Sequence, residues 1–114
     1  MPADLPVLDS SPLSSPAELA GLIAYQPGAV VSRALVQRPT GTVTLFAFDA
    51  GQGLSEHTAP YDAIVFVLDG QADVTVAGTL HRVRRGEALR MPGGRPHALH
   101  APEPFKMLLV MVRS

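Results

Sequence analysis

The sequence contains no cysteine, little net charge and no long apolar run, and each absence excludes a class of function. Without cysteine there is no disulfide, no thiolate metal site and no cysteine nucleophile, which fits a reducing compartment. The net charge of −1 gives no reason to expect DNA or RNA as a partner. No stretch approaches the ~20 consecutive apolar residues of a membrane helix, and no signal peptide is apparent. We therefore expect a soluble, cytoplasmic protein that binds neither nucleic acid nor membrane.

What is present is the composition of one globular domain. The 114 residues are 46% apolar and 17% charged, a balance typical of folded proteins. Residues 1–16 are rich in proline, serine and aspartate and predict an extended or poorly ordered arm. Residues 17–114 are expected to form the domain, which opens with a short helix. Ser15, Pro16 and Glu18 have the spacing of a capping box for that helix.

From Gly28 onward, the sequence has the period-two pattern of half-buried strands. Short β-prone segments are separated by glycine or proline roughly every 8–12 residues. The expected strands are 29–36, 42–48, 63–68, 72–76, 79–83, 88–91, 97–101 and 105–112. The pair Ala77-Gly78 predicts a hairpin between two of them. Seven or more such strands indicate a sandwich or barrel, and nothing resembles the strand–long helix–strand repeat of a parallel sheet.

Two segments carry glycine, proline and histidine at fixed spacing. The matching residues are Gly51, His57 and Gly70 in the first segment and Gly86, Pro92, Gly94 and His97 in the second. With these residues the sequence resembles the cupin superfamily. The first cupin motif is a glycine, five residues, His-x-His, three or four residues, Glu, six residues and glycine. The second is a glycine, five residues, Pro-x-Gly, two residues, His, three residues and Asn.

Three positions depart from the motifs. Ala59 stands at the second histidine, Ala63 at the glutamate and Ala101 at the asparagine. The resemblance covers roughly residues 41–112. It implies an all-β, cupin-type double-stranded β-helix (jelly-roll) barrel with a short N-terminal helix.

A pocket inside that barrel is the expected functional site. Strand alternation puts His57, Ala59 and Ala63 on one face if the bend at Pro60 preserves the register. His97 lies on a later strand, and the resemblance implies that both faces look into the barrel. The expected ligand-binding pocket therefore contains His57, Ala59, Ala63 and His97, and no catalytic residue is assigned.

The resemblance also implies a candidate metal site. Complete cupins hold a divalent Fe, Mn, Ni, Cu or Zn ion with three histidines and one glutamate. This chain keeps only His57 and His97, an incomplete ligand set. Water, substrate or another side chain would have to supply the missing donors. Asp62, turned inward by a bulge, and Tyr61 and Gln52 near the pocket mouth are candidates.

Two functions stay open on these residues. One is a divalent-metal-dependent enzyme of the dioxygenase or isomerase type, acting on a small organic molecule in the pocket. The alternative is a metal-free module that binds or senses a small-molecule ligand in the same pocket. The last expected strand, 105–112, is apolar on both faces. Such a strand suits a subunit interface, and we expect a homodimer in either case.

Overall fold

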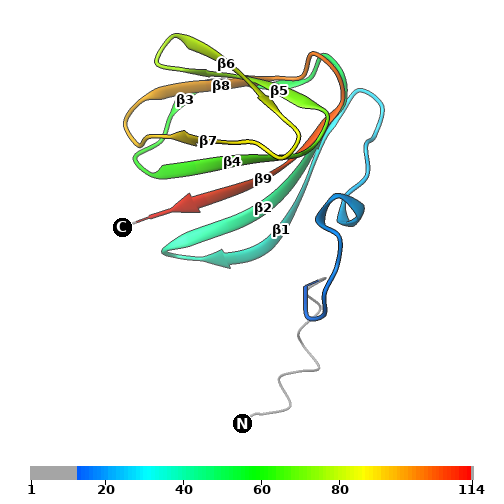
Figure 1. The fold of residues 1–114 in the computed structure, drawn as a ribbon. Coiled ribbons are helices and arrows are strands. Elements are labelled where there is room, and N and C mark those ends of the chain that lie inside the picture. The colour runs from blue at the N-terminus through cyan, green and yellow to red at the C-terminus, as the bar shows by residue number, and fades with distance from the viewer. Residues whose placement is uncertain (1–12, 114) are drawn as a thin grey trace.

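The computed structural model describes residues 13–113, which form two facing sheets of antiparallel strands (Figure 1). The first sheet has the strand order β1-β2-β9-β4-β7 and the second the order β3-β8-β5-β6. The all-β architecture expected from the alternating pattern is confirmed. The strands are β1 Val30–Arg38, β2 Gly41–Phe48, β3 Gly53–Thr58, β4 Asp62–Asp69, β5 Gln71–Val76, β6 Thr79–Arg84, β7 Ala88–Met91, β8 Pro96–His100 and β9 Phe105–Val112.

The expected N-terminal helix is a single 3-10 turn, η2, at Leu19–Leu22. The predicted capping box is wrong, because Glu18 occupies the N-cap position and makes no capping hydrogen bond through its side chain. Tertiary contacts hold the turn instead. Lys106 Nζ donates to the Ala20 carbonyl at 2.7 Å, and Arg33 Nη1 donates to the Leu22 carbonyl at 2.9 Å. Most of the expected arm, residues 1–12, lies outside the described residues. Within residues 13–113, no helix is long and apolar enough to cross a membrane.

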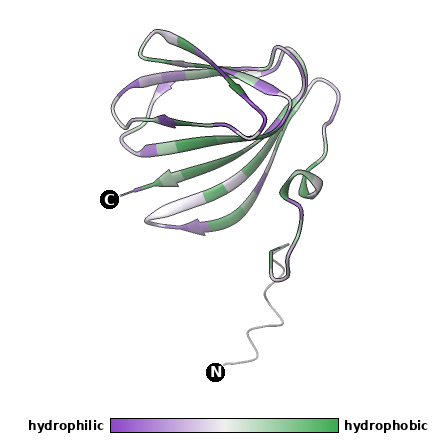
Figure 2. Ribbon diagram, viewed as in Figure 1, coloured by the Kyte–Doolittle hydropathy of each residue, from purple (hydrophilic) through white to green (hydrophobic). Residues whose placement is uncertain are grey.

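The space between the sheets is filled at one end. Phe48 and Phe105 stack there with ring centroids 4.5 Å apart, and Val65 and Val67 beside them have no exposed surface. Such burial supplies the main stabilisation of a small domain, about 1.5–3 kcal/mol for each large apolar side chain. Figure 2 shows β9, which runs through the middle of the first sheet, as hydrophobic along most of its length. The side chains packed at this end hold the two sheets in a fixed position relative to one another.

The outer face of the first sheet is apolar and only partly covered. The segment around η2 packs Ile23 against Leu45 and Ala47. Beyond that cover, the strand registers align four β-branched residues in a row across β1, β2, β9 and β4. They are Val36, Val43, Val110 and Ile64. Val36 and Ile64, at the two ends of this apolar row, are 45% and 44% exposed, and Arg90 on β7 pairs with Ile64.

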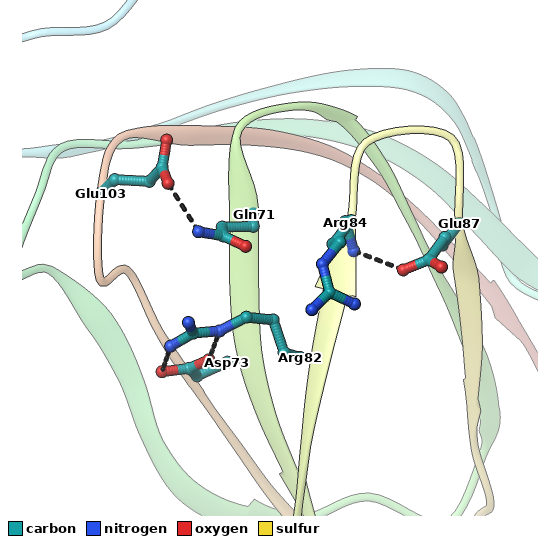
Figure 3. A network of polar contacts seen from close by, with 6 residues as sticks. All are labelled: Gln71, Asp73, Arg82, Arg84, Glu87 and Glu103. Atoms are coloured by element: carbon teal, nitrogen blue, oxygen red, sulfur yellow. Dashed lines mark hydrogen bonds and ion pairs between the residues drawn. The ribbon is translucent and has the colours of Figure 1, made fainter.

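The second sheet carries polar side chains instead (Figure 3). Arg82 on β6 donates to both carboxylate oxygens of Asp73 on β5, at 2.9 and 3.2 Å. Gln71 reaches Glu103, and the Glu87 carboxylate accepts from the Arg84 backbone N–H. Strand β6 is one of the two edge strands of this sheet. Charged side chains on an edge strand discourage pairing with another chain.

Glycines mark the turns as the motif spacing predicts. Gly51, Gly70 and Gly86 all have positive φ angles, of 83°, 70° and 85°. At Gly70 a Cβ would also lie 2.2 Å from the Pro104 carbonyl oxygen. Only glycine fits a left-handed turn that is also packed this closely.

Candidate functional site

The end of the inter-sheet space opposite the phenylalanine stack is a cavity of about 50 Å³. The four residues expected to form the pocket all line it: His57, Ala59, Ala63 and His97. They come from different sheets, since His57 lies on β3 and Ala63 on β4. The sequence prediction treated this stretch as one strand with a bend, and β3 was not among the expected strands. The chain crosses from one sheet to the other near Pro60, yet both segments face the same cavity.

A β-bulge aims His57 into the cavity. Leu54 pairs with Leu99 and His57 pairs with His97, so three steps on β3 match two steps on β8. Strict alternation would place Leu54 and His57 on opposite faces of the strand. The extra residue of the bulge returns both side chains to the cavity wall. His57 is nevertheless an exposed residue, because β3 is the other edge strand of the second sheet.

The two imidazole rings meet inside this wall. Their centroids are 4.4 Å apart and the ring planes cross at 69°, an edge-to-face contact. His97 is only 7% exposed and is the single buried polar or charged residue among residues 13–113. His57 thus forms the solvent side of the pair and His97 the inner side.

Backbone carbonyls fix the proton positions on both rings. His57 Nδ1 lies 2.9 Å from the Ser55 carbonyl oxygen, and His97 Nδ1 lies 3.3 Å from that of Arg95. A carbonyl oxygen only accepts, so Nδ1 is the protonated nitrogen in each ring. In its neutral form each ring therefore presents an Nε2 lone pair, and neither Nε2 atom makes a hydrogen bond within residues 13–113. The pair can accept two hydrogen bonds from a ligand.

Burial lowers the pKa of His97 below its ordinary value of 6.5, and the nearby His57 acts in the same direction. The hydrogen bond to the Arg95 carbonyl opposes both effects, since it favours the protonated ring. The net direction is downward, because the low-dielectric wall penalises an imidazolium. His97 is consequently a neutral acceptor at neutral pH.

Most of the remaining cavity wall consists of apolar side chains. The sequence analysis did not assign these apolar residues to the pocket. Methionines and leucines from β3, β7, β8 and β9 complete it: Leu54, Met91, Leu99, Met107, Leu109 and Met111. The alternation of β9, which puts 107, 109 and 111 on one face, was the signal that could have identified three of them.

The other candidate metal donors differ in whether their side chains lie in the cavity wall. Tyr61 lines the cavity, as one of the alternatives suggested. Asp62 is exposed and does not line the cavity, and its Oδ1 accepts from the Gly93 backbone N–H at 2.8 Å. That hydrogen bond holds the carboxylate to the turn after β7, so the inward orientation considered for Asp62 is not found.

The complete cupin ligand set does not fit these residues. Alanine occupies both positions where the second histidine and the glutamate would stand, and an alanine side chain has no donor atom. Within residues 13–113, no group of three or more His, Cys, Asp or Glu side chains is placed to hold a metal ion. His57 and His97 alone would leave at least two coordination positions to water or ligand.

Comparison with known proteins agrees with this architecture. The chain is 39% identical to a conserved protein of unknown function from Streptococcus pyogenes, whose crystal structure superposes with a TM-score of 0.85 over 89% of each chain. It is 41% identical to a cupin 2 conserved barrel domain protein from Leptotrichia buccalis, with a TM-score of 0.80 over 82% of this chain and 46% of that one. An uncharacterized protein of Streptomyces coelicolor is 34% identical over 70 residues, which are 60% of this chain and 67% of the relative.

A family model described as a cupin domain matches residues 44–112, more than half of the chain. That range contains all four pocket residues expected from the sequence and ends with β9. The jelly-roll arrangement implied by the glycine and histidine spacing is therefore confirmed. The protein belongs to the cupin domain family.

Proposed function

We propose that the protein binds a small organic molecule in the barrel cavity without a resident metal, using His57 and His97 as its polar contacts. The observation that carries this proposal is the pair of Nε2 lone pairs in a wall that is apolar apart from Tyr61. Binding sites for small molecules combine apolar walls with a few placed polar groups in this way. A ligand that donates a hydrogen bond, such as an alcohol or a weak acid, matches either of the two Nε2 acceptors.

The size of the cavity limits the ligand. Its volume of about 50 Å³ is well below the roughly 150 Å³ of an apolar cavity that holds benzene. A ligand within the cavity must therefore be a short-chain compound, or extend from the cavity mouth beside His57. The exposed position of His57 on an edge strand makes that side of the wall the natural entrance.

The test is a thermal-shift screen of short-chain alcohols, amides and acids against the wild type and three variants. We expect bound compounds to raise the melting temperature of the wild type and of His100→Ala, whose residue lies exposed on β8. The shift should be lost in His57→Ala and His97→Ala. The proposal fails if no compound stabilises the wild type, or if both cavity variants respond as the wild type does.

A divalent-metal-dependent enzyme of the dioxygenase or isomerase type is the second candidate. One observation favours it: each Nδ1–H is tied to a backbone carbonyl, as metal-binding histidines commonly are. The absence of two of the four cupin metal ligands argues against this metal-dependent enzyme. Elemental analysis of protein purified without added metal decides between the two, because a stoichiometric ion that disappears in His57→Ala would replace the first proposal.

We also propose that the protein is a homodimer built on the exposed outer face of the first sheet. The row from Val36 to Ile64 is apolar across four strands and is bordered on β7 by the exposed Arg90, which pairs with Ile64. A two-fold axis brings the same patch of each subunit together, so a flat apolar row meets its own copy. In this proposed dimer the interface lies on the outward side of β9, away from the cavity.

A further inference from the structure

The inner faces of β4 and β9 continue past the cavity to its mouth. Alternation carries the row of Met107, Leu109 and Met111 on to Arg113, and it carries Ala63 back to Tyr61. Asp62 pairs with Val112, so Tyr61 and Arg113 stand opposite each other one step further along the ladder. The backbone N–H of Arg113 donates to the Thr40 carbonyl at 2.8 Å, which holds this end of the chain beside β2.

A cation lies over the aromatic ring at that mouth. The Arg113 Cζ is 4.9 Å from the centroid of the Tyr61 ring, a distance at which a guanidinium is attracted to the ring face. Tyr61 is itself part of the cavity wall. The stacked ring therefore places a guanidinium at the rim of the apolar cavity.

This guanidinium has unused hydrogen-bonding capacity. Its Nε atom is buried and is the one buried side-chain nitrogen or oxygen without a hydrogen-bond partner in residues 13–113. Arg113 also makes no ion pair in that part of the chain, where the single ion pair joins Arg82 and Asp73. The nearest acidic residue in the ladder, Asp62, is engaged by the Gly93 N–H. A buried donor without a partner is costly, and an anion at the mouth would remove that cost.

We propose that Arg113 binds the carboxylate of a short-chain hydroxy acid whose carbon chain enters the cavity. The proposal rests on the binding function proposed above and names its substrate class. The planar fork of arginine matches the two oxygens of a carboxylate, and the methionine and leucine wall matches a hydrocarbon chain. The hydroxyl group can donate a hydrogen bond to one of the two acceptors, His57 Nε2 or His97 Nε2. The small cavity volume restricts the chain to a few carbons.

The experiment compares 3-hydroxybutyrate with its neutral amide, 3-hydroxybutyramide, by calorimetry and by NMR of the histidine rings. We expect the acid to bind the wild type about tenfold or more tightly than the amide. Arg113→Gln should remove that difference by weakening the acid alone, and Arg113→Lys should restore part of it. Arg84→Gln is the control, because it removes the same charge from an exposed position on β6.

The outcomes separate this inference from the binding function on which it rests. Equal binding of acid and amide to the wild type, or an unchanged preference in Arg113→Gln, overturns the role of Arg113 and leaves the histidine pocket intact. Loss of both ligands in His57→Ala and His97→Ala supports the pocket, whatever Arg113 does. If neither compound binds the wild type or moves its histidine ring signals, the assignment of a short-chain hydroxy acid is wrong, and the thermal-shift screen alone decides the binding function.

Discussion

His57 and His97 face one another across the β3–β8 ladder, and their rings touch edge to face with centroids 4.4 Å apart. The two residues are far apart in the sequence and come from the two cupin motifs. Each ring is oriented by the carbonyl two residues before it. Because the contact joins a buried ring to an exposed one, it links the interior of the cavity to solvent.

The depressed pKa of His97 predicts a loss of stability in mild acid. The unfolded chain takes up a proton at this residue near the ordinary pKa of 6.5, whereas the folded chain does so only at lower pH. Stability is therefore fully present above about 6.5 and falls as the pH drops from there through the folded pKa. We expect denaturant titrations in the presence of a chelator to show a weaker pH dependence in His97→Gln than in the wild type. His100→Gln should keep the wild-type slope, and parallel curves for the wild type and His97→Gln would contradict the prediction.

Restoring the two missing ligands should create a metal site. The double variant Ala59→His, Ala63→Glu places a third imidazole and a carboxylate at positions that already line the cavity. We expect its affinity for divalent iron, nickel or zinc to exceed that of the wild type by roughly 100-fold or more, since even second-shell partners change metal affinity 10–100-fold. Metal titration with a competing chelator measures it. An affinity equal to the wild type would show that the cavity walls do not converge as described.

Gly70 should tolerate substitution less well than Gly86. Both have a positive φ, which costs an alanine about 1–2 kcal/mol. A Cβ at Gly86 meets nothing within 4 Å, while one at Gly70 lies 2.2 Å from the Pro104 carbonyl oxygen. We expect urea denaturation to show Gly70→Ala as the more destabilised variant, by more than ~2 kcal/mol relative to wild type. The opposite order would mean that the turn before β9 rearranges freely.

The proposed dimer can be tested by placing a charge in the apolar row. Ile64 lies at one end of the row and is 44% exposed. We expect Ile64→Lys to be monomeric by light scattering at micromolar concentration, because a lysine ammonium would be buried in the interface without a partner. Leu80→Lys is the matched control, since Leu80 is 63% exposed on β6 in the other sheet. A wild-type monomer, or a dimer that survives Ile64→Lys, argues against this surface.

The motif spacing was sufficient to predict the jelly roll and the cavity-facing positions of His57, Ala59, Ala63 and His97. Two strands, Ala88–Met91 and Phe105–Val112, have the bounds expected from their patterns. The bulge in β3 was not predictable, because one inserted residue leaves no periodic signal. The capping box failed for a related reason: the turn at Leu19–Leu22 is held by Lys106 and Arg33, which are distant in the sequence.

The position of Arg113 over the Tyr61 ring could not be predicted from the sequence, also for a physical reason. A charged residue just after an apolar strand ordinarily indicates that the strand has reached solvent. Only the register of β4 against β9 shows that this residue lies opposite Tyr61. Side-chain alternation can be obtained from one strand, but the neighbour across the ladder requires the fold.

Strand β3 has β8 as its one partner in the sheet and carries His57 on an irregular stretch of backbone. Few hydrogen bonds must break for it to separate from β8, so it should be among the first segments to open locally and to exchange its amide protons. Opening there would widen the cavity without disturbing the Phe48–Phe105 stack at the opposite end. The protein could thus admit a molecule larger than its resting interior while the rest of the jelly roll stays folded.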